Sequence, residues 1–295
     1  MKRNNLKYIV AFAVVLLSCS KSNDTSSPGG NGGGGNGGGN GGGSKDTSCV
    51  IATISQVNSS TGAEFSLSAF YNSSYGVNKL VIFDSAKNAK DFEAVFNYVT
   101  PDSVRINQYQ YLILDASKKV IRFATKSDLN DVANAEDYLF EYIYNNDGYL
   151  ATKNLYVNGT KLPNFSTAYT YTNNLLTHCV MTAVSSGNLK VLESDLTHDN
   201  NLKIKNWIYT FPDAIEGYMY LTVLNFGNRV TSPLKQVVTK IYNPTSGALI
   251  DTWTTNYSNY KTDSHGYILS GEANGDLQQG IATFYGKTNF YYYCH

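Results

Sequence analysis

The chain has 295 residues, of which 42% are hydrophobic and only 16% are charged, and its formal net charge is zero. An average soluble domain is about 25% charged, so this one depends on Asn, Ser and Thr for its solubility. Beyond residue 48, 18 basic residues stand against 21 acidic ones. A phosphate-binding surface needs concentrated Lys and Arg, so no nucleic-acid partner is expected. The roughly 250 residues that remain can bury about 70–75% of their unfolded surface, enough to fold without a metal.

The first residues have the pattern of an export signal. Three basic residues precede the apolar run 8–17, which is about half of the roughly 20 residues that a membrane-spanning helix needs and is typical of a signal peptide. The run ends in Leu-Leu-Ser-Cys at Cys19, and this ending resembles the lipobox of bacterial lipoproteins. The resemblance implies that residues 1–18 are a lipoprotein signal peptide, and that Cys19 receives a diacylglycerol and anchors the protein in membrane lipid.

A polar tether follows the expected lipidation site. Residues 19–48 are rich in Gly and Asn and carry no side chain that could form a core, so we expect them to be disordered with a root-mean-square span of about 30 Å. The leader resembles those of Bacteroidetes cell-envelope lipoproteins, many of which reach the outer-membrane surface. The resemblance implies a membrane-anchored envelope protein, with the periplasmic and the surface face both open.

From residue 49 to residue 295 the sequence predicts a single β-rich domain. Hydrophobic and polar residues alternate with period two in Phe65–Tyr71, Phe140–Tyr144 and Leu202–Lys205, which is typical of antiparallel strands with one buried face. Turn signals separate such runs and favour tight hairpins: Asn145–Gly148, Asn158-Gly159, Asn173-Asn174, Pro244–Gly247 and His265-Gly266. We therefore expect an all-β antiparallel meander of hairpins that forms a large curved or rolled sheet. Asp128–Asp137 is the best candidate for a short helix, with a loop as the alternative.

Two correspondences suggest an internal duplication. The segment that begins Cys49-Val50 parallels the one that begins Cys179-Val180, and Asp147–Leu150 parallels His265–Ile268. We interpret them as two halves, near 49–178 and 179–295, that share one core. Chance similarity between strands of like composition is the alternative.

A smaller unit joins a strand that ends in Tyr to a strand that starts with an apolar residue, through a Gly turn. It occurs at Tyr144–Leu150 and at Tyr242–Leu249, with Asn145 and Asn243 after the tyrosines. This unit resembles the Tyr-Asp (YD) repeat hairpins of RHS-type proteins and of uncharacterised Bacteroidetes lipoproteins. The resemblance implies a long meander of hairpins and supplies no catalytic residue.

Catalytic and metal-binding signatures are missing from the sequence. The four His residues have no metal-ligand spacing, and no nucleophile or phosphate-loop motif is present, so we expect no cofactor and no enzymatic activity. The alternative is a carbohydrate-active or other hydrolytic enzyme whose carboxylate pair has no sequence signature. Glu93, Asp115, Glu141, Glu193 and Asp195 are the acids from which such a pair could come. An enzyme of this kind should show a deep pocket that holds two acids with shifted pKa values.

Three cysteines remain once Cys19 is lipidated. Cys49, Cys179 and Cys294 could all be buried thiols, which free Cys often is. The oxidising cell envelope also permits pairing, and Cys179 with Cys294 is then the preferred bridge.

Aromatic residues are the most abundant recognition chemistry that the sequence offers. The 24 Tyr suit half-buried strands by propensity, so most are expected to be structural. Trp253 and Tyr257 lie at i and i+4 of one strand face, with Asp251 beside them, and are our candidates for contact with a glycan. The sequence thus predicts a non-catalytic binding or structural module of the envelope, with a glycan or another envelope protein as its partner.

Overall fold

The computed structural model describes residues 49–57, 64–73, 76–85, 87–205, 207–213, 218–276 and 286–294. The expected signal peptide, Cys19 and the tether lie outside these residues. Within them, no helix has the length and apolar character that a membrane span requires.

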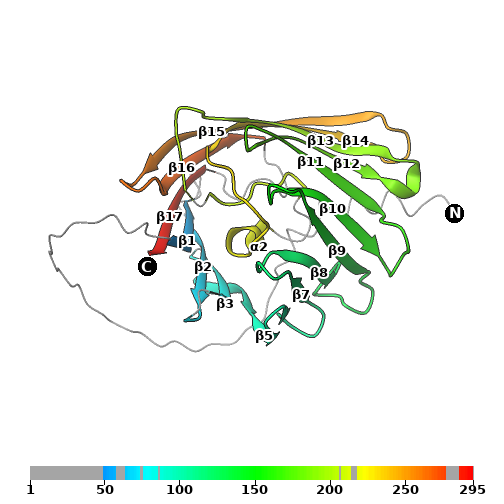
Figure 1. Cartoon of the computed structure of the whole chain (residues 1–295), viewed down its shortest axis with the longest axis horizontal. Coiled ribbons are helices and arrows are strands. Elements are labelled where there is room, and N and C mark those ends of the chain that lie inside the picture. The colour runs from blue at the N-terminus through cyan, green and yellow to red at the C-terminus, as the bar shows by residue number, and fades with distance from the viewer. Residues whose placement is uncertain are drawn as a thin grey trace.

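A single antiparallel sheet of 17 strands makes up almost the whole described structure (Figure 1). Its first nine strands are β1 (Cys49–Val57), β2 (Glu64–Tyr71), β3 (Val77–Asp84), β4 (Ala89–Val95), β5 (Asn97–Thr100), β6 (Ser103–Arg105), β7 (Tyr111–Leu114), β8 (Val120–Lys126) and β9 (Asp137–Tyr144). The remaining eight are β10 (Leu150–Val157), β11 (Phe165–Thr172), β12 (Leu175–Ala183), β13 (Leu189–His198), β14 (Leu234–Tyr242), β15 (Leu249–Thr262), β16 (Ile268–Gly275) and β17 (Gly286–Cys294). A 3-10 turn, η1 (Val184–Ser186), and a short helix, α2 (Tyr218–Val223), complete the elements.

Strand pairing follows chain order and then returns on itself. With the exception of β4 and β5, each strand pairs with the next one along the chain, and β17 pairs with β1 from Cys49↔Cys294 to Val57↔Lys287. β4 and β5 are separated only by Phe96, and β4 pairs with β3 whereas β5 pairs with β6. The result is a nearly closed, barrel-like sheet, which confirms the predicted all-β antiparallel meander.

The direction of the strands defines two rims. Because neighbouring strands are antiparallel, the starts of β1, β3, β8, β14 and β16 lie at the same end of the sheet as the end of β17. We call this end the terminal rim, since the described chain both enters and leaves there. The other end, the far rim, carries the hairpin turns near residues 158–164 and 243–248.

Alternation along the strands fills the interior with apolar side chains. In β2, Leu67 and Ala69 are buried whereas Phe70 is exposed, and in β9 Phe140 and Tyr142 are buried. The predicted turns are confirmed: positive φ angles occur at Gly148, Asn158, Gly159, Asn173, Asn174, Gly247 and Gly266, as tight hairpins require.

The connector between β13 and β14 runs from residue 199 to residue 233, and its described segments 207–213 and 220–226 lie mostly inside the rolled sheet. Trp207 is 1% exposed, Phe226 is 1% exposed, and α2 sits near the middle of the ring in Figure 1. The connector includes Leu202–Lys205, which was predicted as a strand. Residues 202–205 do not form a strand, so that prediction is wrong, although Ile204 is buried as the alternation requires.

The helix predicted at Asp128–Asp137 is also wrong. Residues 127–136 form turns and bends. The Asp128 carboxylate accepts hydrogen bonds from the Asn130 and Asp131 backbone N–H groups, and Asn134 donates its side-chain amide to Asp131. Such side chains compete with helical hydrogen bonding, so this polar segment folds as a loop.

Candidate functional site

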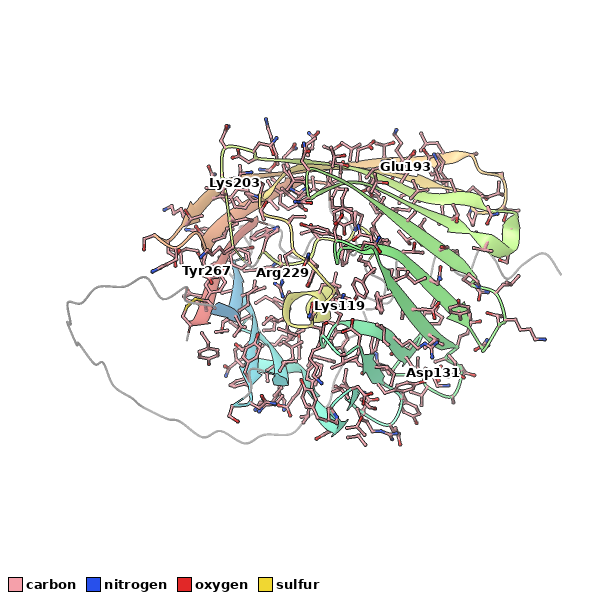
Figure 2. The ribbon with its side chains drawn as sticks, viewed as in Figure 1. Lys119, Asp131, Glu193, Lys203, Arg229 and Tyr267 are labelled. Carbon is pink, nitrogen blue, oxygen red and sulfur yellow. A yellow bond between two sulfur atoms is a disulfide. The ribbon has the colours of Figure 1, made fainter. Side chains whose placement is uncertain are left out.

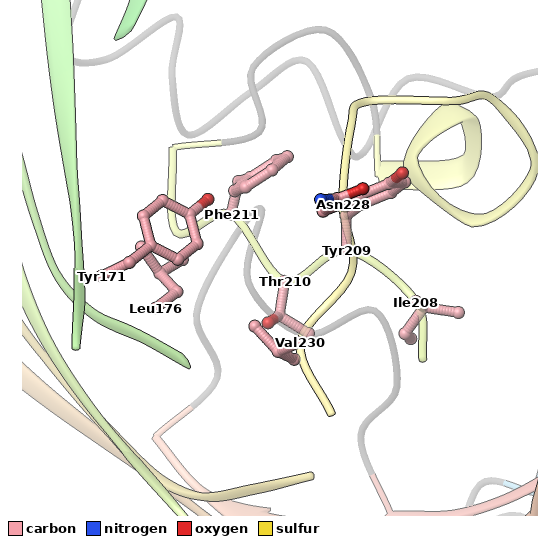
Figure 3. A pocket seen from close by; sticks show the side chains of 8 residues that line it. All are labelled: Tyr171, Leu176, Ile208, Tyr209, Thr210, Phe211, Asn228 and Val230. Atoms are coloured by element: carbon pink, nitrogen blue, oxygen red, sulfur yellow. The ribbon is translucent and has the colours of Figure 1, made fainter. Parts of the chain in front are cut away.

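The connector between β13 and β14 occupies much of the interior of the rolled sheet, where a ligand could otherwise bind. The recess in Figure 3 lies where the connector faces β11 and β12, and its cavity volume is about 10 Å³, which is room for about one water molecule. Small-molecule sites usually need about 300–1,000 Å³. Its lining is Tyr171, Leu176, Ile208, Tyr209, Thr210, Phe211, Asn228 and Val230. The lining contains no carboxylate, so this recess lacks the acid pair that a hydrolytic site of the expected kind requires.

A buried ion pair holds the connector against the wall of the sheet. Lys153 on β10 and Asp213 on the connector have side chains that are 2% and 0% exposed, and Lys153 Nζ lies 3.1 Å from Asp213 Oδ2. Lys153 Nζ also donates to the Asp213 backbone carbonyl at 2.6 Å. On β11, Thr167 donates its hydroxyl to Asp213 Oδ2, and Tyr169 donates to Oδ1 at 2.6 Å. Each carboxylate oxygen therefore has a donor, as a buried charge needs.

Hairpin turns at the terminal rim fasten the connector at two further places. The Gly148 carbonyl accepts a hydrogen bond from Asn228 N at 2.8 Å, and the Gly266 carbonyl accepts one from Lys205 N at 2.9 Å. A Cβ on Gly227, whose φ is +90°, would lie 2.3 Å from the Gly148 carbonyl oxygen, so this contact requires glycine. These turns belong to Asp147–Leu150 and His265–Ile268, the two segments whose sequences correspond, and each accepts a backbone hydrogen bond from the connector. The duplication of whole halves stays a prediction.

Most rim tyrosines are structural. Tyrosines on five strands donate their hydroxyls to backbone carbonyls near the start of an earlier strand, which is the preceding one except for Tyr98 on β5 and Val77 on β3: Tyr71 to Ile51, Tyr98 to Val77, Tyr144 to Val120, Tyr260 to Leu234 and Tyr292 to Ile268, at 2.6–3.1 Å. Burial raises the pKa of all five hydroxyls, so they stay protonated donors. These five tyrosines therefore connect strands to one another at the terminal rim.

The predicted glycan contacts differ in accessibility. Tyr257 is 5% exposed and packs in the core, so the expectation that its ring meets a ligand is wrong, because its strand face points into the sheet. Trp253 is half-buried, and its indole Nε1 donates to Asp251 Oδ2 at 2.7 Å. Asp251 thus lies beside Trp253 as expected, but the two aromatic rings do not form one accessible surface.

The cysteines follow neither prediction in full, since the expectation of three buried thiols holds for Cys179 and is wrong for Cys49 and Cys294. Cys49 and Cys294 form a disulfide, and Cys179 is a free, fully buried thiol. A bridge between Cys179 and Cys294 is therefore wrong, because Cys179 lies on β12, whereas Cys49 is the direct partner of Cys294 across β1 and β17. Burial, followed by the nearby Asp213 carboxylate, raises the pKa of the Cys179 thiol.

We expect Cys179 to be inert to a thiol reagent such as 5,5′-dithiobis(2-nitrobenzoic acid) until the chain unfolds, because the thiolate is the reactive form and the side chain is inaccessible. The reagent should count no thiol in the native full chain and one thiol in denaturant without reductant. Two thiols in denaturant would show that Cys19 is unmodified, and three would show that the disulfide is open.

Two carboxylates of β13, Glu193 and Asp195, lie on its outward face beside His178 of β12, around the position labelled Glu193 in Figure 2. His178 Nδ1 lies 2.7 Å from Asp195 Oδ1, and its Nε2 lies 3.7 Å from Glu193 Oε1. Hydrogen bonds from Lys190 and then Tyr242 lower the pKa of Glu193. A general acid requires the opposite shift, so this cluster lacks the signature of a glycosidase acid.

Polar pairs line the outward face of the sheet around most of its circumference. Directly opposed residues are hydrogen-bonded or ion-paired across five strand pairs: Thr53 with Ser68, Arg122 with Glu141, Asn154 with Ser166, His178 with Asp195, and Gln236 with Asn256. The molecule is thus apolar inside and predominantly polar outside.

Comparisons with known proteins find solved structures that share the fold, but no family model and no curated relative. No protein-family model matches the chain, and no curated protein matches it either. A crystal structure of a porin-like protein from Bacteroides uniformis matches with a TM-score of 0.54 and 15% identity, over 82% of this chain and 96% of that one. A porin-like protein from Bacteroides vulgatus matches with a TM-score of 0.51 and 12% identity, over 83% and 99% of the two chains. At these identities the likeness shows a shared fold alone.

Proposed function

We propose that this protein is a lipid-anchored, non-catalytic module of the bacterial cell envelope whose working surface is the outside of the rolled sheet. The observation that carries the proposal is the packing of the described connector segments 207–213 and 220–226 inside the sheet, where the Lys153–Asp213 pair holds the connector. Because the interior is filled, partners have the outward face and the rims available to them.

A conducting pore is the competing function, since the neighbours of known structure are described as porin-like. Strands that span an outer membrane alternate apolar side chains toward lipid with polar ones toward the lumen. Here the alternation is the reverse, with Phe123 and Phe140 inside and the Arg122–Glu141 ion pair outside. The outward face therefore suits water better than acyl chains.

Attachment through Cys19 agrees with this arrangement. The expected tether joins the described chain at Cys49, so the point of attachment would lie on the terminal rim. A tether of about 30 residues would permit about 95 Å of reach when fully extended. The Cys49–Cys294 disulfide also agrees with an oxidising compartment such as the envelope.

Replacing Cys19 with Ala is expected to abolish lipid labelling and to leave the protein either uncleaved or released from the membrane. The measurement is incorporation of radiolabelled fatty acid, followed by membrane fractionation. A Cys179→Ala variant is the matched control and should label like the unaltered protein. Unchanged labelling of the Cys19→Ala variant would contradict the anchor.

The full chain, purified in detergent and added to a planar lipid bilayer, should produce no channel conductance. An outer-membrane porin measured in parallel provides the positive control. Reproducible unitary conductance steps from this protein would overturn the module proposal in favour of a pore.

A further inference from the structure

Exposed aromatic side chains are confined to one arc of the sheet. Among the described residues, the aromatic side chains that are at least 37% exposed are Phe70, Phe83, Tyr98, Tyr111, Tyr291 and Tyr293. They belong to β2, β3, β5, β7 and β17. These strands form one contiguous arc with β1, β4 and β6. The described residues of β8 to β16 carry no aromatic side chain of comparable exposure, so the distribution is one-sided.

We propose that the outward face of β17, β1, β2 and β3 binds a neutral glycan chain, with Tyr291 and Phe83 as the stacking rings. This inference rests on the proposed function, because it assigns a ligand class to the outside of the sheet. Tyr291 is 55% exposed and Phe83 is 37% exposed. Three strand steps of about 4.8 Å separate their strands, so the platform is about 14 Å wide. This width suits several sugar units laid across the strands.

Hydroxyl groups occupy the face between the two rings. Thr53 on β1 is opposite both Tyr291 and Ser68, and the Thr53 and Ser68 hydroxyl oxygens lie 3.2 Å apart. Ser66 is opposite Phe83. Aromatic rings provide a flat apolar surface for the C–H face of a sugar, and the hydroxyls can exchange hydrogen bonds with its OH groups. The rings and the hydroxyls therefore match the two kinds of surface that a sugar presents.

Lysines are too few on the platform strands to make a cationic surface. Lys79 on β3 lies over the Phe70 ring, and Lys287 on β17 is the other lysine of these strands. On the adjoining hairpin, Lys87 Nζ lies 3.0 Å from both Asp84 Oδ2 and Asp91 Oδ2, and Lys90 Nζ lies 3.0 Å from Glu93 Oε2. A surface for anionic lipid headgroups needs a cluster of several Lys or Arg, so a neutral ligand fits this face better.

Phe70 is excluded from the stacking rings by its neighbour. Lys79 Nζ lies 4.6 Å from the centroid of the Phe70 ring, so that ring already holds a cation over its face. Trp253, the candidate from the sequence, lies on β15 outside the arc, and its indole N–H is bound by Asp251. Trp253 therefore provides an internal comparison for the platform.

The test is native affinity electrophoresis of the full chain in detergent, in gels that contain laminarin, xylan or galactomannan, with polygalacturonate as the charged probe. At least one neutral polysaccharide should retard the protein, and polygalacturonate should not. A Tyr291→Ala, Phe83→Ala double variant should lose at least about tenfold in affinity, an amount equal to about 1.4 kcal/mol. Trp253→Ala should bind like the unaltered protein.

Circular dichroism of each variant distinguishes lost binding from lost fold, and Tyr291→Phe, Phe83→Tyr should keep most of the affinity because it keeps both rings. No retardation by any neutral polysaccharide, or loss on Trp253→Ala without loss in the double variant, would overturn the platform. Either result leaves the lipidation and conductance outcomes untouched, so failure here is distinguishable from failure of the proposed function.

Discussion

Replacing Lys153 with Met should lower the free energy of unfolding by about 3–5 kcal/mol, because it leaves the Asp213 carboxylate charged and buried without its counter-ion. Both side chains are almost fully inaccessible, and the pair joins β10 to the connector. Removing the cation should therefore loosen the connector from the wall. Urea unfolding followed by circular dichroism measures the change in stability.

Two further variants make this result interpretable. Lys190→Met breaks an ion pair of similar length on the outward face, where the Lys190 side chain is 40% exposed, and should cost less than about 1 kcal/mol. A Lys153→Met, Asp213→Leu double variant removes both charges together and should recover much of the lost stability. A double variant as unstable as Lys153→Met alone would show that the pair itself, rather than avoidance of an orphaned charge, stabilises the protein, whereas a loss equal to the sum of both single variants would show that the two side chains act independently.

The class of fold could be predicted because the strands carry their pattern locally. Phe65–Tyr71 has one buried and one exposed face, and turns such as Asn145–Gly148 contain residues that accept positive φ angles. These are properties of neighbouring residues, so alternation and turn chemistry reveal them. Closure of the sheet between β1 and β17 joins segments more than 200 residues apart, and no local pattern encodes that partner.

The connector shows most clearly what sequence patterns miss. Trp207 to Phe211 is a short apolar run after a polar stretch, and such runs are compatible with a strand or a buried irregular segment alike. Only the surrounding sheet determines that this run fills an interior. The same limit explains Asp213 and Lys153, which are 60 residues apart and meet because the connector folds inward.

Functional residues were predicted less well than the fold, for a related reason. Alternation placed Trp253 and Tyr257 on one strand face, but whether that face points inward depends on the curvature of the whole sheet. Tyr257 is buried, whereas Tyr291 is 55% exposed, although both are strand tyrosines with similar neighbours. Exposure of an aromatic ring is set by the tertiary structure, and local composition does not reveal it.

Removing the Cys49–Cys294 disulfide should lower stability by up to about 5 kcal/mol while leaving the folded spectrum unchanged. The bridge closes a loop with a sequence separation of 245 residues, and a cross-link acts mainly by restricting the unfolded chain, more so for long loops. In the folded state the pairing of β1 with β17 persists without it, and Cys49 N still donates to the Tyr267 hydroxyl at 3.0 Å. The measurement is the urea midpoint of a Cys49→Ser, Cys294→Ser variant.

Reductant gives the matched comparison. Dithiothreitol should move the midpoint of the unaltered protein to that of the Cys49→Ser, Cys294→Ser variant and should leave the variant's own midpoint in place. Cys179→Ala keeps the bridge, so it should still respond to reductant, although the smaller buried side chain lowers its stability. Equal midpoints for the oxidised protein and the double-serine variant would contradict the role of the disulfide. Closure of the sheet would then depend on the hydrogen-bonded pairing of β1 and β17 alone.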